Sequence, residues 1–142
     1  LQTIKPFKHF KSIKKGVNMK KSIVIVEDDI NIAKAEALIL QKDFNVHLAH
    51  DGETGHALVK EVKPDLVILD LMLPKLHGYE VCKKIKEDPE LVETKVIMVT
   101  AKNENKDEIQ GLDIGADDYI MKPFEGTELK HVVNQVLNKN NE

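Results

Sequence analysis

Short, mostly apolar runs alternate with longer amphipathic segments along most of this chain. Each run is apolar at successive positions, which favours strands that are buried on both faces. The runs are IVIV at 23–26, VHLA at 46–49, LVIL at 66–69, VIMV at 96–99 and DYIM at 118–121. The intervening segments are rich in Ala, Leu, Glu and Lys, which predicts helices over 30–42, 53–62, 78–87, 104–113 and 126–138. The pattern therefore predicts five βα units.

Five successive βα units predict an α/β fold. Strands buried on both faces need helices above and below a parallel sheet. Right-handed crossovers then give a doubly wound (βα)5 three-layer sandwich with a parallel five-stranded sheet. The helix ends agree, because Asp29 is suited to cap the first helix, Gly78 opens the third and Gly115 follows the fourth. At 142 residues the chain suits one domain, which can fold without a disulfide or a metal.

Charge is distributed unevenly along the chain. The first 21 residues hold seven lysines and no acid, so the rest holds 14 basic and all 24 acidic side chains, a formal charge of −10. This acidic body suits a cation or a basic partner and disfavours direct nucleic-acid contact by the domain. No apolar run approaches the ~20 residues of a membrane span. We expect a cytoplasmic protein.

Residues 1–18 form a separate basic segment. They repeat an apolar-Lys-x triplet, which is typical of an amphipathic anchor or a docking segment. However, the first residue is not Met, Pro6 interrupts an early helix, and MKKSIVIVEDD at Met19 is typical of a natural start. We therefore expect residues 1–18 to be a disordered or non-native extension and residues 19–142 to form the domain.

Polar side chains follow four of the five predicted strands at their carboxyl ends. In a doubly wound sheet, ligands bind beyond these ends, near the point where the strand order reverses. Any one of the residues has a structural explanation, because Asp often caps helices and Lys is usually solvated. Their joint occurrence at one edge predicts a functional site. They are Glu27, Asp28 and Asp29 after the first strand, Asp70 after the third, Thr100, followed by Ala101, after the fourth, and Lys122, followed by Pro123, after the fifth.

Four motifs give the chain a resemblance to a known family. They are VEDD at 26–29, DLMLPKLHG at 70–78, VTA at 99–101 and GADDYIMKPF at 115–124. With these motifs and their spacing, residues 21–138 resemble the receiver domain of two-component response regulators. The resemblance implies a flavodoxin-like sheet with the strand order 2-1-3-4-5.

The resemblance implies that Asp70 is the phosphoacceptor. Thr100 and Lys122 are then expected to contact the phosphoryl group, and Tyr119 to be the aromatic switch residue. Lys122 is also expected to precede Pro123 through a cis peptide bond. Phosphoryl transfer consists mostly of positioning and charge neutralisation, and an ionised carboxylate can attack phosphorus to give an acyl phosphate.

The resemblance also implies a magnesium site. Glu27, Asp28, Asp70 and the backbone carbonyl of Met72 are the expected ligands, with Mn²⁺ able to replace Mg²⁺. Oxygen ligands are those that Mg²⁺ prefers. The six histidines show no persuasive metal-site spacing, and Cys82 lies among apolar residues, as expected of a buried thiol.

These roles imply a phosphorylation-dependent signalling switch that catalyses only its own phosphorylation and dephosphorylation. The chain has no phosphodonor histidine in a kinase-like context, so a histidine kinase or a histidine phosphotransfer protein is the expected donor. The chain ends in NKNNE soon after the fifth helix. It is therefore either a stand-alone receiver that binds a downstream target protein or part of a regulator whose output domain is missing. The sequence leaves both open.

Three other interpretations use the same residues. Some receiver-like domains are phosphate-independent interaction modules, although every required residue type is present in this chain. A phosphohydrolase with an aspartate nucleophile needs a second Asp two residues later, where this chain has Met72. In the third interpretation, the acids are only helix caps and Thr100 and Lys122 are surface groups.

Two further positions are expected to tune the lifetime of the phosphoryl group. Met72 and Lys102 lie two residues after Asp70 and Thr100. There they would flank the path of an attacking water, and an apolar Met and a long Lys would hinder it. This favours slow self-dephosphorylation.

Overall fold

A computed structural model describes residues 20–101 and 115–138. All five predicted strands are present, as are four of the predicted helices, and a short 3-10 helix precedes the fourth strand. The helix predicted over 104–113 lies outside the described residues, as do Lys102 and residues 1–18. In chain order the elements are β1 (Lys21–Val26), α2 (Ile30–Leu40), β2 (Phe44–Ala49), α3 (Gly52–Val62), β3 (Leu66–Asp70), α4 (Gly78–Glu87), η1 (Pro89–Leu91), β4 (Lys95–Thr100), β5 (Asp118–Met121) and α6 (Gly126–Asn138).

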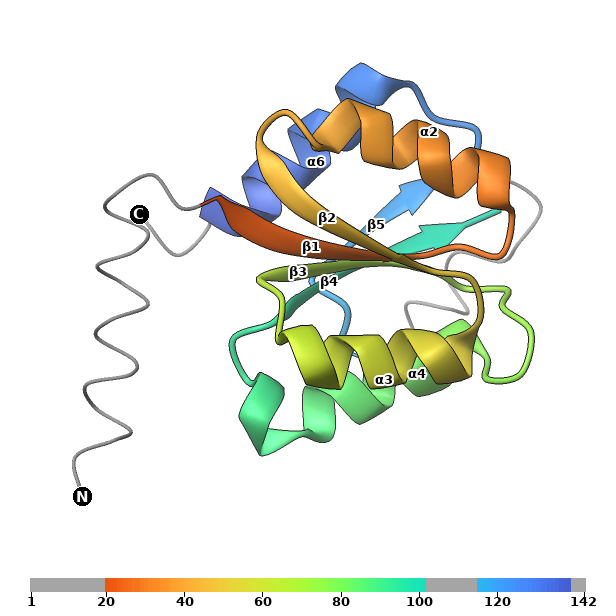
Figure 1. The fold of residues 1–142 in the computed structure, drawn as a ribbon, viewed down its shortest axis with the longest axis vertical. Helices are drawn as coiled ribbons and strands as arrows, with labels where there is room; N and C mark the ends of the chain where they lie inside the picture. Colours follow the sequence, from red (N-terminus) through yellow and green to blue (C-terminus); the bar gives the residue numbers. More distant parts are fainter. Residues whose placement is uncertain (1–19, 102–114, 139–142) are drawn as a thin grey trace.

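The five strands form one parallel sheet in the order β2-β1-β3-β4-β5, which confirms the predicted topology. Figure 1 shows α2 and α6 on one face of this sheet and α3 and α4 on the other. The described part of the chain is therefore the predicted three-layer α/β sandwich. Within these residues, no helix has the length and apolar character that a membrane crossing needs.

Alternate residues of each central strand pack into different helical layers. Val24 and Val26 of β1 belong to the core beneath α3 and α4, whereas Ile23 and Ile25 belong to the core beneath α2 and α6. All four side chains are completely buried. Burial of a Val or Ile side chain contributes ~1.5–3 kcal/mol, so both faces of the sheet are strongly apolar. This explains why the strands appear in the sequence as unbroken apolar runs.

The first helix ends earlier than the sequence predicts, and the second strand begins earlier. α2 ends at Leu40, and the Asp43 amide donates to the Leu40 carbonyl at 3.1 Å in the turn that follows. β2 then begins at Phe44, which pairs in register with Lys21. A tight turn thus replaces the last predicted turn of helix and lets β2 pair along the whole of β1.

Local caps fix the chain where it leaves the sheet. Asp29 caps α2 as predicted, because its side chain accepts a hydrogen bond from the Ile32 amide at 3.0 Å. Gly78 opens α4 as predicted, and a Cβ atom there would lie only 2.3 Å from the Asp70 carbonyl oxygen. Only glycine permits this approach, which holds the loop after β3 against the strand end.

Candidate functional site

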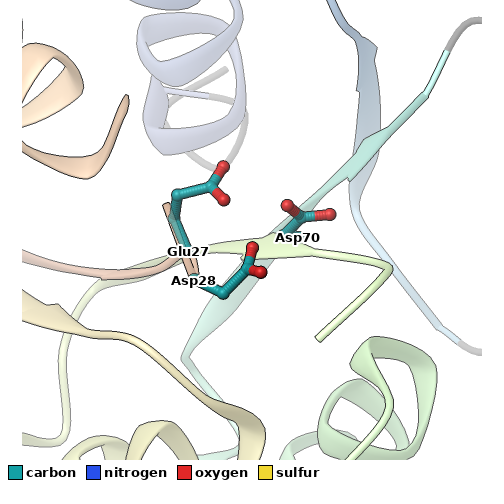
Figure 2. Close-up of side chains that lie close together, drawn as sticks. All are labelled: Glu27, Asp28 and Asp70. Atoms are coloured by element: carbon teal, nitrogen blue, oxygen red, sulfur yellow. The ribbon is translucent and has the colours of Figure 1, made fainter. Parts of the chain in front are cut away.

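The ends of β1 and β3 bring three acids together. Glu27 and Asp28 follow β1 directly, and Asp70 is the last residue of β3. One carboxylate oxygen from each residue lies within 4.8 Å of the other two. Figure 2 shows the three carboxyl groups gathered around one space. The predicted convergence of these side chains at one edge of the sheet is confirmed.

Burial differs among the three acids. Glu27 is 3% exposed and Asp70 is 9% exposed, whereas Asp28 is exposed to solvent. Burying a carboxylate without a compensating charge is costly. The two inner acids therefore need a positive partner, while the outer one faces solvent, from which a ligand can approach.

Lys122 supplies that positive charge from the loop after β5. Its Nζ donates to Glu27 Oε1 at 2.6 Å and to Asp70 Oδ2 at 3.0 Å. Burial works against the charged ammonium, but the hydrogen bonds to Glu27 and Asp70 outweigh it and raise the pKa of Lys122. The Lys122–Pro123 peptide is cis, as predicted. Asp28, Asp70 and Lys122 therefore lie on the same side of the molecule.

Glu27 has a strongly raised pKa. Its pKa is raised to about 7 in total: burial raises it most, the hydrogen bonds from Lys122 and from the Asp29 amide lower it, and the charge of Asp70 raises it. Its backbone and side chain are also fixed, because the Asp29 amide donates to Oε2 at 3.1 Å and His50 Nδ1 lies 2.9 Å from its carbonyl oxygen. Without further positive charge, this carboxyl therefore holds its proton more readily than an ordinary glutamate.

Thr100 ends β4 beside this acid cluster. It pairs in register with Met121, the last residue of β5, and is only 2% exposed. Its Oγ1 has no hydrogen-bond partner within the residues that the structure describes. A buried hydroxyl without a partner is costly, so this oxygen is available to a ligand.

Tyr119 lies in the sheet, whereas the backbone of Met72 lies beside the acid cluster. Tyr119 is half-buried on β5 and packs against the core beneath α3 and α4, so it belongs to the sheet rather than to the acid cluster. The Met72 amide donates to Asp70 Oδ1 at 3.1 Å, which places its backbone beside the cluster. The Met72 side chain is 57% exposed.

Two residues near the site were not predicted from the sequence. Glu36 of α2 is only 4% exposed, and His50 follows β2 and contacts the Glu27 carbonyl. The sequence holds a signal for Glu36, because it lies between Ala33 and Leu40 at the spacing of a buried helix face. His50 has a weaker signal, namely its position directly after a strand whose end lies at the same edge.

Cys82 agrees with the sequence prediction. Cys82 is buried, and burial raises the pKa of its thiol to about 11, as in an inert core cysteine. Across residues 20–101 and 115–138, the acid cluster is the one group of three or more potential metal ligands, and it contains no histidine.

Comparisons with known proteins point to a single family. The family model of the response regulator receiver domain matches residues 23–134. The transcriptional regulatory protein DltR of Streptococcus agalactiae is 46% identical over 108 residues, which cover 75% of this chain and 47% of DltR. The chain thus spans about half the length of the curated relatives that it matches.

Solved structures agree in fold and sequence. A CheY-like receiver domain protein from Methanospirillum hungatei is 29% identical, with a TM-score of 0.78 over 87% of this chain and 98% of its own. The BeF3-activated DrrB receiver domain is 38% identical, with a TM-score of 0.74 over 84% of this chain and 99% of its own. This chain therefore belongs to the response regulator receiver domains, the phosphorylation-dependent switches of two-component signalling.

Proposed function

We propose that Asp70 is the phosphoacceptor of this receiver domain. One observation carries the proposal. A carboxylate oxygen of Asp70 lies within 4.8 Å of an oxygen of Glu27 and of one of Asp28, and Asp70 Oδ2 accepts a hydrogen bond from Lys122 Nζ at 3.0 Å. Its carboxylate can attack phosphorus, and the Lys122 ammonium lies close enough to neutralise negative charge on the product. The solved structure of the DrrB receiver domain carries the description BeF3-activated, which supports activation by the same class of chemistry in this chain.

A divalent cation fits the acid cluster. Three carboxylates from two strand ends offer hard oxygen ligands, the donor type that Mg²⁺ prefers, and the exposed Asp28 leaves them open to solvent. We assign Glu27, Asp28, Asp70 and the backbone carbonyl of Met72 as the residues that would hold Mg²⁺, with Mn²⁺ able to replace it. When bound, the cation supplies the positive charge that lets an anionic phosphoryl donor approach an anionic carboxylate.

The protein's own residues then act on the phosphoryl group. An oxygen of Asp70 forms a bond to phosphorus while the bond from phosphorus to the donor's imidazole nitrogen breaks, which leaves an acyl phosphate on Asp70. The Lys122 ammonium turns from its carboxylate partners to a phosphoryl oxygen. The unpartnered Thr100 hydroxyl donates to another. The domain in this way catalyses its own phosphorylation and later dephosphorylation, without turnover of other substrates.

The switch then passes from Thr100 to Tyr119. As Thr100 moves toward the phosphoryl group, it vacates space, and the half-buried ring of Tyr119 occupies it. Tyr119 lies on β5, at the edge of the sheet, so its motion changes a surface that a partner can contact. A local change in charge thereby becomes a change in the binding surface.

The partners follow from the family. A histidine kinase or a histidine phosphotransfer protein donates the phosphoryl group. A downstream target protein or an output domain responds to the switch, since relatives such as DltR are named transcriptional regulators and the match covers only 47% of DltR. The acidic body of the receiver itself makes no direct nucleic-acid contact in this proposal.

Acetyl phosphate with Mg²⁺ tests the assignment. We expect the native protein to incorporate phosphate and Asp70→Asn to abolish incorporation, as followed by intact-protein mass spectrometry. Asp43→Asn is a matched control, because Asp43 is an exposed acid in the turn before β2. Incorporation by the Asp70→Asn protein at the native rate overturns the assignment. Absence of incorporation in the native protein favours a phosphate-independent interaction module instead.

A further inference from the structure

Glu36 is a buried acid that the chemistry described above does not use. It lies on α2, on the helix face that it shares with Ala33 and Leu40, and is 4% exposed. Its Oε2 has no hydrogen-bond partner anywhere in the described ranges. Polar groups buried in this way are usually hydrogen-bonded, because an unpaired one is costly. A carboxyl group kept in such a place therefore needs an explanation beyond packing.

The charges that act on Glu36 all belong to the site. The pKa of Glu36 is raised to about 7 in total: burial raises it most, the charge of Glu27 raises it, that of Lys122 lowers it, and that of Asp70 raises it. The helix α2 also contacts β1, β2 and α6. No ionisable side chain within these three elements is among the charges that shift Glu36; those side chains are Lys21, His47, Glu128, Lys130 and His131. Glu36 therefore responds to the net charge of the site.

That net charge changes when a divalent cation binds. The cation adds two positive charges beside the three carboxyl groups and the Lys122 ammonium, so the site becomes less negative. Less negative surroundings favour the ionised form of a nearby carboxyl. Because coupling between two binding events is reciprocal, an ionised Glu36 must in turn strengthen cation binding by the same factor.

We propose that Glu36 is a fourth acidic group of the site, one that does not hold the cation but releases a proton to solvent when the cation binds and recovers it when the cation leaves. This role rests on the cation site proposed above. Near neutral pH, Glu36 holds its proton about half of the time in the cation-free protein, so binding releases about half a proton from this residue. Cation affinity then rises with pH around neutrality.

Carboxyl ¹³C NMR of Glu36 tests the proposal directly in the native protein. The titration midpoint of Glu36 is measured without Mg²⁺ and with saturating Mg²⁺. We expect Mg²⁺ to lower the midpoint by about one pH unit, a tenfold change in proton affinity. In parallel, Mg²⁺ affinity is measured on both sides of neutral pH for the native protein and Glu36→Gln. Affinity should rise with pH about tenfold more in the native protein than in the variant.

The controls separate this role from the cation site itself. Glu61→Gln removes an exposed acid from α3, on the other face of the sheet, and should keep the native pH dependence. If the native protein does not bind Mg²⁺, the proposed function fails. If it binds Mg²⁺ but the Glu36 midpoint does not move, the role of Glu36 is wrong, as it is if Glu36→Gln keeps the native pH dependence. The NMR measurement decides the question even if Glu36→Gln does not fold.

Discussion

Two half-buried lysines lie at opposite edges of the sheet, one where the strands begin and one where they end. The charges that surround them differ. At the amino-terminal edge, Lys86 Nζ lies 2.7 Å from Asp117 Oδ2 and donates to the Thr94 carbonyl at 3.1 Å. The same Asp117 oxygen accepts the Val96 amide at 2.8 Å. One ammonium is matched by one carboxylate. This cluster joins α4 to the starts of β4 and β5 and is electrically balanced.

At the carboxyl-terminal edge, one ammonium faces three carboxylates. Lys122 contacts Glu27 and Asp70, and Asp28 completes the group. Buried oxygens of Thr100 and Glu36 have no partner within the described chain. The comparison teaches that a balanced cluster supports the fold, whereas an unbalanced one with free hydrogen-bonding capacity is ready for a charged ligand.

Removing Lys122 tests the functional half of this comparison and should have the largest effect. In the native protein, phosphorylation with acetyl phosphate and Mg²⁺ should shift the NMR signals of the Tyr119 ring. We expect Lys122→Ala, where it is still phosphorylated, to lose this shift completely, because without the ammonium the phosphoryl group is not held where Thr100 can move toward it and vacate the space that Tyr119 enters. Lys130→Ala, which removes an exposed lysine of α6, is the control. An unchanged Tyr119 response in the Lys122→Ala protein contradicts the proposed switch.

The site at the carboxyl-terminal edge could largely be predicted from the sequence. Runs that are apolar on both faces indicate a parallel sheet, and a parallel sheet places the ends of all its strands at one edge. Asp28, Asp70 and Lys122 could therefore be assigned to one place, although Lys122 lies 52 residues after Asp70. Assigning these three residues to one site did not require knowledge of individual side-chain contacts.

The balanced cluster and Glu36 could not be predicted in the same way. The contact between Lys86 and Asp117 depends on how α4 packs beside the start of β5, and each residue alone is an ordinary surface charge in the sequence. Glu36 resembles a good helix former in a helix rich in alanine. Its spacing from Ala33 and Leu40 is compatible with a buried helix face, but only the packing of α2 against the sheet shows that this face is the buried one.

Glu36→Leu tests whether the unbalanced edge costs stability. An acid whose pKa rises from 4.5 to about 7 on folding binds more protons in the folded state between those values, so stability falls as pH rises through that window. Without Mg²⁺, we expect Glu36→Leu to be more stable than the native protein by roughly 3 kcal/mol near pH 8, most of it absent near pH 4. Urea denaturation at both pH values measures this. A difference that does not depend on pH would show that packing alone is responsible.

Asp117→Asn tests the balanced edge. The amide can still accept the Val96 hydrogen bond, but Lys86 loses its charged partner in a half-buried position. We expect the free energy of unfolding to fall by about 2 kcal/mol, the scale of a charge-assisted hydrogen bond. Mg²⁺ affinity should stay at the native value, because Asp117 lies at the opposite edge of the sheet. A variant with native stability and weakened Mg²⁺ binding would reverse the roles assigned to the two edges.

Glu90→Gln should have the smallest effect. It separates the contribution of charge matching from that of burial. Glu90 Oε1 lies 3.5 Å from Lys63 Nζ, so this pair is also one ammonium matched by one carboxylate. Both side chains are more than half exposed, however, and solvent screens such pairs. We expect urea denaturation to show a change within about 0.5 kcal/mol. A loss of stability as large as that of Asp117→Asn would mean that charge matching stabilises the fold by itself. A negligible loss would mean that the Lys86 cluster stabilises the fold through its burial and its backbone hydrogen bonds.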